Sequence, residues 1–435
     1  MLPKLVNQFP ALKPAKADAI NRVSICLGVT SVVGVLMLGV PTPAQAANSK
    51  DLQKLLTLKT CPGCDLKDAQ LRGINLRNAD LRNAQLDGAD LTAADLTGAK
   101  LEGAQLNGAK LTAANLEKAN LRQAKLAAAN KIVVDLTDAK LRGANLYAAN
   151  LTGAKLERAR LEQTQLNFAQ LAGANLGQAN LIEANLSGAN LAGANLKEAQ
   201  MQMVNLAGAN LTGAKLNNAQ LDTANMDSVN LSNADLSQAS LNNADLNGGI
   251  LTGANLQKGS LTAANLQSAT LTGANLTGAN LTGAGFNRAN LTGAKFNDAD
   301  LTNAKLPLAN LTNANLAGAN LQDAYLDSTN LSGANLSGVN LRGANLRSAN
   351  LSGASMIGTN LESANLMSAI LTGANLSYTN FSSADLRGAN LGNTNLSYAN
   401  LTQTDLGQAS LANANLTGTN WKDAKLKGVI GLNGY

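Results

Sequence analysis

A large apolar residue returns at every fifth position along most of this chain. Leu stands at positions 66, 71, 76 and 81, and the spacing holds to position 426, which makes (426 − 66)/5 + 1 = 73 successive positions. Sixty-five of them are Leu; the other eight are Lys131, Met201, Met226, Phe286, Phe296, Met356, Phe381 and Trp421. Ala usually stands two positions before each of these residues, and Asn or Asp stands between the two.

A period of five excludes the common regular structures as a basis for this pattern. An α-helix repeats every 3.6 residues and would carry the Leu side chains around all its faces, whereas a flat strand would point them alternately to opposite faces. The pattern is satisfied if the backbone turns once every five residues and points one Leu and one Ala inward. Gly and Asn, which are frequent after each Leu, tolerate the positive φ that such corners need.

Composition narrows the functional classes. Aromatic residues are 3% of the chain and His is absent, so His-based triads, His general bases and His metal ligands are excluded. Residues 1–46 hold four basic residues and one acid, which leaves 34 − 4 = 30 basic and 28 − 1 = 27 acidic residues, or a net charge of +3, for the remainder. This near balance indicates no strong overall attraction to nucleic acid or to anionic lipid.

Residues 1–46 are typical of a secretory signal. Four basic residues precede an uncharged apolar stretch from Val23 to Val40, two prolines follow it, and Ala44-Gln45-Ala46 offers the small residues that signal peptidase requires. We therefore expect cleavage after Ala46. The alternative is an uncleaved membrane anchor, since 18 apolar residues barely span a bilayer.

The five-residue units, such as Ala174-Asn175-Leu176-Gly177-Gln178, resemble those of the pentapeptide-repeat family. The resemblance extends from Cys64 to about Gly428. It implies an all-β fold, a right-handed quadrilateral parallel β-helix with four pentapeptides per coil. Seventy-three units then give about 18 coils, and a stack roughly 85 Å long at about 4.8 Å per coil.

The ends of such a stack need covers, because its last strands are unpaired. Residues 48–60 favour a short helix with Asn48 or Ser49 as N-cap and with Leu52, Leu55 and Leu56 on its apolar side. The expected organisation is a signal peptide (1–46), a capping helix with a Cys-Pro-Gly-Cys linker (47–63), the β-helix (64–428) and a C-terminal cap or tail (429–435). We expect the tail to cover the last coil; the alternative is contact with another molecule.

Cys61 and Cys64 both fall at inward positions between the helix and the first coil. An oxidising compartment and an even number of Cys after cleavage favour a structural disulfide between them. The alternatives are buried free thiols, or redox or metal chemistry; a zinc site lacks a third Cys or any His.

Six residues are candidates for an interaction surface: Lys131, Ile357, Tyr378, Tyr398, Trp421 and Tyr435. Lys131 is the one charged residue at a central position, and we expect a local bulge that turns it outward; a binding site is the alternative. Tyr378 and Tyr398, which are separated by four pentapeptides, should stack on one outer face with Ile357 nearby. A row from Thr92 through Thr112 and Thr152 to Thr372 should line another face.

The sequence favours an exported, non-catalytic structural or protein-interaction scaffold without a cofactor. The resemblance to exported cyanobacterial members of the family implies the periplasm or the thylakoid lumen. The expected partner is another protein, not nucleic acid; the mature chain should not be membrane-embedded, and end-to-end self-association stays open. Two alternatives are less favoured: a DNA mimic that protects DNA gyrase, as in quinolone-resistance relatives, and a hydrolase that uses carboxylates such as Asp298 and Asp300.

Overall fold

The computed structural model describes residues 48–126 and 134–432. These residues belong to one compact unit, Ala44–Tyr435. The predicted signal segment, Lys131 and Tyr435 therefore fall outside the described residues. Within the described ranges, no helix has the length and apolar character that a bilayer crossing requires.

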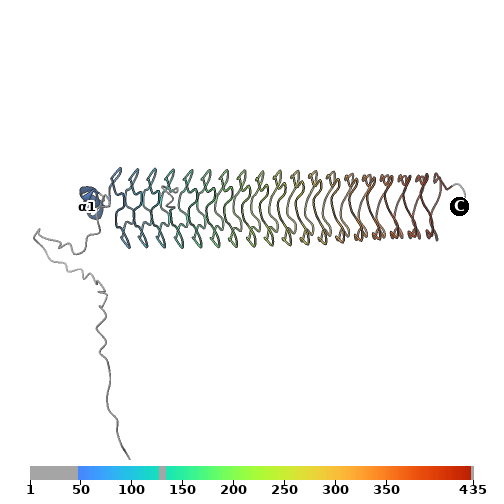
Figure 1. The fold of residues 1–435 in the computed structure, drawn as a ribbon, viewed down its shortest axis with the longest axis horizontal. Helices are drawn as coiled ribbons and strands as arrows, with labels where there is room; N and C mark the ends of the chain where they lie inside the picture. The colour runs from blue at the N-terminus through green and yellow to red at the C-terminus, as the bar shows by residue number, and fades with distance from the viewer. Residues whose placement is uncertain (1–47, 127–133, 433–435) are drawn as a thin grey trace, which may run out of the picture. The chain divides into compact units, whose positions relative to one another are not determined.

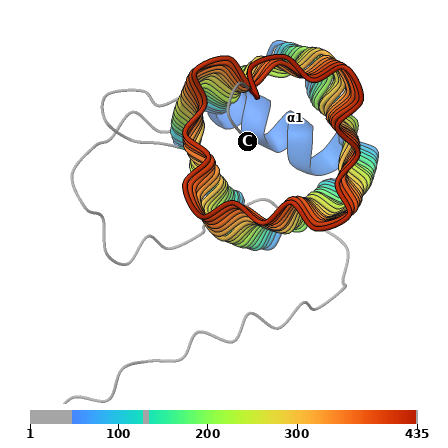
Figure 2. The same ribbon diagram turned by 90° about the vertical axis from the view of Figure 1, so that its right-hand side faces the viewer.

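The described body is a stack of square coils (Figures 1 and 2). Its strands are single-residue parallel bridges, most of which join residues four pentapeptides apart, such as Asn320 with Asn340 and Asn340 with Asn360. Successive bridges lead from Thr60 to Lys425 in 18 steps, because (425 − 60 − 5)/20 = 18, with one step longer than the others by a single pentapeptide. The predicted right-handed quadrilateral β-helix of about 18 coils is confirmed.

Each side of a coil is one pentapeptide, whose five places are well illustrated by Ala289-Asn290-Leu291-Thr292-Gly293. Ala289 at the first place and Leu291 at the central, third place are 1% and 0% exposed. At the second place, the Asn290 side-chain oxygen accepts the backbone N–H of Thr292 at 3.2 Å. Gly293 at the fifth place turns the corner with φ +65°. The repeat is therefore a corner whose inner residues build the core.

The backbone hydrogen bonds between coils are not symmetric. Leu291 and Gly293 donate their N–H groups to Asn310 and Thr312 of the next coil, at 2.7 and 3.0 Å. Only Asn290 donates toward the previous coil, to Ala269 at 2.9 Å. Two N–H groups in each pentapeptide thus point toward the C-terminal end for each one that points toward the N-terminal end.

One coil is longer than the sequence period predicts. Bridges from Lys110 to Asp135 and from Lys125 to Asn150 span five pentapeptides, after which the step of four returns. One additional pentapeptide is therefore accommodated between Leu126 and Val134, a segment that includes the predicted bulge. Because the unit is a whole repeat, it preserves the five-residue spacing and shifts every later residue by one side of the square.

This shift corrects the predicted Thr row. The Ala113 N–H donates to the Thr137 carbonyl at 3.0 Å, so Thr112 is followed on its face by Thr137 and not by a position that leads to Thr152. Thr152 lies instead on the face that later carries Thr212 and Thr372. The expected single row is wrong, because Thr92 and Thr112 belong to a different side of the square from the later members.

The N-terminal end is covered by the helix α1, Ser49–Leu58 (Figure 1). Asn48 is its N-cap and accepts the Lys50 N–H at 3.1 Å, as predicted. Leu55 is fully buried and Leu52 packs against the core. Leu56 is 54% exposed, so its predicted place on the apolar side is wrong: the covered face of α1 is narrower than the spacing of its leucines indicates.

Pro307 occupies the fourth place of its pentapeptide. At this place the backbone N–H normally donates to the second-place side chain, as in Thr312 with Asn310 at 3.1 Å. The second place before Pro307 is Lys305, whose ammonium cannot accept a hydrogen bond. Pro therefore stands where its missing N–H leaves no acceptor unmet.

Candidate interaction surfaces

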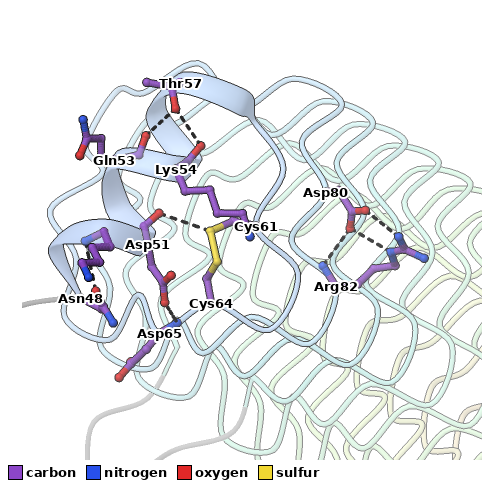
Figure 3. Close-up of a disulfide and its surroundings, with 11 residues drawn as sticks. Asn48, Asp51, Gln53, Lys54, Thr57, Cys61, Cys64, Asp65, Asp80 and Arg82 are labelled. Atoms are coloured by element: carbon purple, nitrogen blue, oxygen red, sulfur yellow. Dashed lines mark hydrogen bonds and ion pairs between the residues drawn. A yellow bond between two sulfur atoms is a disulfide. The ribbon is translucent and has the colours of Figure 1, made fainter.

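Cys61 and Cys64 lie where α1 meets the first coil (Figure 3). Their sulfur atoms are bonded to each other, and their Cα atoms are 5.4 Å apart. Asp51 of α1 lies against the pair: its carbonyl oxygen is 3.3 Å from Cys61 Sγ, and its carboxylate accepts the Asp65 N–H at 3.0 Å. The pair and Asp51 together hold the helix on the coil.

The same three side chains form the one cluster in the described residues with metal-ligand spacing. One atom each from Asp51, Cys61 and Cys64 lies within 4.8 Å of the others. Bonded sulfurs offer no thiolate to a metal, so only the carboxylate of Asp51 stays available as an anionic ligand. The cluster therefore links α1 to the first coil.

Tyr378 and Tyr398 form an exposed aromatic stack. Their ring centroids are 5.2 Å apart with an interplanar angle of 11°, and their exposed fractions are 63% and 57%. Each stands at a fifth place with positive φ, which directs its ring outward and over the next coil. Gly418 follows them on the last coil and leaves room for Tyr398, since a Cβ there would lie 2.7 Å from the ring.

The other predicted surface residues lie at different depths. Ile357 is 41% exposed. It is followed by Gly358, which occupies the position equivalent to Tyr378 on the previous coil. Trp421 occupies a central place of the last coil, where it is only partly buried against the core. The structure thus associates Ile357 with the tyrosine stack and places Trp421 at the C-terminal end of the solenoid.

A second aromatic cluster was missed by the sequence reasoning. The Arg122 guanidinium lies 5.2 Å from the centroid of the Tyr147 ring, and Tyr147 meets Phe168 edge to face at 5.8 Å. The contact between Tyr147 and Phe168 joins neighbouring coils of the normal length. Arg122 reaches Tyr147 only because the long coil adds one pentapeptide, so a rule of four pentapeptides per coil cannot find this contact.

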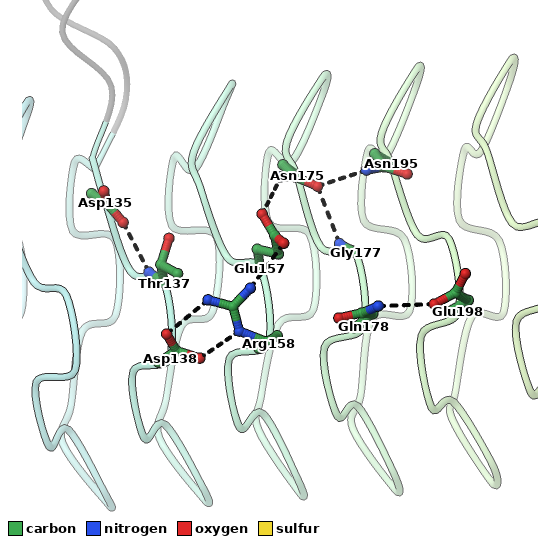
Figure 4. A network of polar contacts seen from close by, with 10 residues as sticks. All are labelled: Asp135, Thr137, Asp138, Glu157, Arg158, Asn175, Gly177, Gln178, Asn195 and Glu198. Atoms are coloured by element: carbon green, nitrogen blue, oxygen red, sulfur yellow. Dashed lines mark hydrogen bonds and ion pairs between the residues drawn. The ribbon is translucent and has the colours of Figure 1, made fainter.

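Some charged residues of the N-terminal half form networks along the faces, as around Arg158 (Figure 4). Arg158 binds Asp138 of the previous coil through two hydrogen bonds, at 2.8 and 2.9 Å, and Glu157 at 2.9 Å. The hydrogen bonds from Arg158 hold the pKa of Asp138 below its ordinary value. These carboxylates serve as links between coils, and the network is exposed, so its contribution to stability is small.

The two carboxylates of the hydrolase alternative lie at different places of the repeat. Asp300 accepts the Thr302 N–H at 3.0 Å and the Asn320 side-chain amide at 3.3 Å, which is the usual role of a second-place residue. Asp298 stands at a fifth-place corner with φ +54°. Their environment is that of ordinary repeat positions.

The C-terminal part of the solenoid carries a shallow groove of about 650 Å³. Three basic side chains, Arg387, Lys425 and Lys427, line it together with Met367 and Asp405. Glycines at positions 388, 407 and 428 form much of the remaining wall. Arg387 is bound to Asp385 at 2.6 Å, whereas Lys425 reaches Asp405 at 3.5 Å.

Comparison with known families gives one match that runs along the described body. The profile described as Pentapeptide repeats matches residues 64–103, 104–130, 134–167, 169–206, 189–227, 205–243, 221–257, 260–298, 294–333, 334–373, 374–411 and 394–430. Between residues 64 and 430, the matched segments leave out only residues 131–133, 168, 258 and 259. A comparison with curated protein sequences finds none that matches this chain.

Several solved structures are similar to this chain. HetL, a pentapeptide-repeat protein from the cyanobacterium Nostoc sp. strain PCC 7120, is 33% identical over 62% of this chain and 93% of its own, with a TM-score of 0.17. The fluoroquinolone-resistance protein QnrB1 is 25% identical over 45% of this chain and 90% of its own, with a TM-score of 0.23. AT2G44920 from the Arabidopsis thaliana thylakoid lumen is 34% identical over 23% of this chain and 62% of its own, with a TM-score of 0.10.

Proposed function

This chain belongs to the pentapeptide-repeat family, and on that basis we propose that it is an exported, non-catalytic scaffold that binds another protein. The observation that carries this proposal is the exposed stack of Tyr378 and Tyr398 on a regular solenoid face. Contact of an aromatic ring with water is unfavourable in free energy, and exposed aromatic side chains are enriched at protein–protein contacts. A stack that is already ordered loses little conformational entropy when a partner covers it.

Two features support export to the periplasm or the thylakoid lumen. The first is the pattern of residues 1–46, with its basic start, apolar stretch and small-residue cleavage site. The second is the bonded pair Cys61 and Cys64. Disulfides persist in oxidising compartments and are rare in the reducing cytosol, so the pair is consistent with a location outside it.

The charge of the chain disfavours the gyrase-protecting alternative. A DNA mimic must present an acidic surface, whereas residues 47–435 carry a net charge of +3, from 30 basic and 27 acidic residues. Export would also separate the protein from gyrase. The surface carboxylates Asp138 and Asp385 are neutralised by neighbouring arginines, which further weakens any acidic row.

The scaffold role is tested by site-specific photo-crosslinking in the cells that make the protein. A photoreactive amino acid is placed at Tyr378, at Tyr398 or, as a matched control, at Tyr325, which is 53% exposed but has no stacked neighbour in the described part of the chain. We expect the first two positions to capture the same exported protein and Tyr325 to capture none. Equal capture at all three positions, or none, contradicts the proposal, and capture of gyrase supports the alternative.

A further inference from the structure

The two ends of the solenoid differ in how well the core is covered. Upstream of the last coil, the central leucines are almost fully buried, but Leu426 is 39% exposed and Ile430 is 63% exposed. Trp421, Val429 and Leu432 pack against the core but stay partly open. Figure 2, seen from the C-terminal end, shows α1 across the far end and no described element across the near one. The expected C-terminal cover is therefore incomplete within the described residues.

This end also presents a ring of backbone hydrogen-bond donors. The N–H groups that would join a following coil have no backbone acceptor in the described part of the chain; they belong to Asn413, Leu416, Gly418, Trp421, Asp423, Leu426 and Gly428. Their counterparts one coil earlier are paired, as Leu406 is with Lys425 at 2.9 Å. Within the described residues, these donors are left to water or to an incoming acceptor.

The backbone makes this end electropositive. Because two N–H groups in each pentapeptide point toward the C-terminal end for each one that points away, the peptide dipoles do not cancel. Their sum places partial positive charge at the C-terminal end, by the same addition that gives an α-helix its macrodipole. The sign is opposite to that of an α-helix, whose C-terminus is negative.

Side chains add positive charge to the same end. Lys422, Lys425 and Lys427 are exposed there, and Asp423 is the one acid between Trp421 and Leu432. Lys425 pairs with Asp405 at 3.5 Å, whereas Lys422 and Lys427 form no ion pair within the described residues. Near the positive end of the dipole these two lysines do not stabilise the fold, so their presence is better explained by a partner. Lys425 and Lys427 also line the groove beside Arg387, whose charge is balanced by Asp385.

We propose that the C-terminal end of the solenoid docks onto an anionic lipid surface. A second copy is disfavoured, because a tail-to-tail contact would oppose two sets of lysines and α1 covers the only other end. A flat end with donors facing outward matches a plane of phosphate acceptors. Trp and Lys around an apolar centre are the composition of membrane-interface segments. The proposal goes beyond the scaffold role and does not depend on it.

The chain carries its own probe of this docking, since Trp421 is its one tryptophan. The full-length protein is titrated with phosphatidylglycerol vesicles or phosphatidylcholine vesicles, and Trp emission and acrylamide quenching are followed. The apolar segment 23–40 can attach the chain to vesicles by itself, so sedimentation is not the readout. We expect a blue shift and protection from quenching, with at least about tenfold stronger binding to the anionic vesicles, weakened at high salt.

Two charge-reversal variants separate the ends of the solenoid. Lys422→Glu with Lys425→Glu and Lys427→Glu should lose the emission shift, whereas the matched control Lys50→Glu with Lys54→Glu and Lys67→Glu should keep it. Circular dichroism verifies that both variants are folded. An unchanged Trp421 emission with anionic vesicles, or equal shifts with both lipids, overturns the proposal. A shift that grows with protein concentration alone identifies a second copy instead, and one produced by poly-glutamate but not by vesicles identifies an acidic protein.

Discussion

At the scale of single residues, the pentapeptide assigns one physical task to each place. Leu and Ala fill the core, the second-place Asn caps the turn, and the fifth place adopts positive φ. The inward tasks of Leu and Ala follow from the sequence period. Gly and Asn tolerate this conformation, yet Phe168, Leu308 and Tyr378 also adopt it at the fifth place, with φ values of 58°, 60° and 59°. The coil imposes this conformation on any residue, and the residue bears the strain.

Relief of this strain at one position should stabilise the protein. Leu308 has φ +60° and is 55% exposed, so Leu308→Asn removes little buried surface and introduces a residue that tolerates the conformation. We expect the free energy of unfolding in urea to rise by about 0.5–1 kcal/mol. Ala317→Asn, at a fourth place whose φ is not positive, serves as the control and should change it little. A loss of stability in Leu308→Asn would show that its side chain makes contacts that outweigh the strain.

At the scale of elements, sequence reasoning found α1 and its N-cap but not its orientation. Leu52, Leu55 and Leu56 are all compatible with one apolar stripe, and only the position of the first coil decides that Leu56 faces solvent. The long coil was missed for a different reason. Its additional unit has the length of the repeat, so the period continues across it, and only pairing between coils reveals the step of five pentapeptides.

Loss of the contact between α1 and the first coil should leave the rest of the solenoid folded. Leu55→Ala removes a fully buried side chain at the junction and should weaken docking by about 2–4 kcal/mol. Since each coil contacts only its neighbours, amide hydrogen exchange should accelerate in α1 and residues 60–80 and stay unchanged beyond residue 200. Leu58→Ala, at a side chain that is 66% exposed, is the matched control. Acceleration throughout the solenoid in Leu55→Ala would contradict local docking.

At the scale of the whole molecule, the fold class was predictable because 73 successive units share one pattern of inward and outward residues. The site was less predictable. Tyr378 and Tyr398 were found by counting four pentapeptides, but the Arg122–Tyr147 contact depends on the long coil. The asymmetry of the ends depends on which backbone groups lie unpaired, and spacing alone does not reveal that.

The stability of the protein should depend on pH only in the acidic range, below about pH 4. The chain has no His, so stability should be level from about pH 5 to 8. Hydrogen bonds from Arg82, Arg158 and Arg387 hold the pKa values of Asp80, Asp138 and Asp385 below 3.8 in the folded state. A carboxyl with a lowered folded pKa contributes stability above its unfolded pKa, and this contribution is lost as the pH falls through the folded pKa.

Urea unfolding at a series of pH values measures this dependence. The free energy of unfolding should begin to fall below about pH 4, and replacement of the three arginines by Gln should reduce the acid slope. A transition between about pH 5 and 8 would contradict the assignment, because none of these carboxyls titrates in that range.

We propose that this solenoid works outside the cytosol with Cys61 and Cys64 oxidised. The most direct test is the intact mass of the protein purified from the cells that make it, under conditions that trap free thiols. We expect a chain that begins at Ala47 and is about 2 Da lighter than its fully reduced form, without thiol adducts. A full-length chain that carries trapped thiols at Cys61 and Cys64 would contradict it.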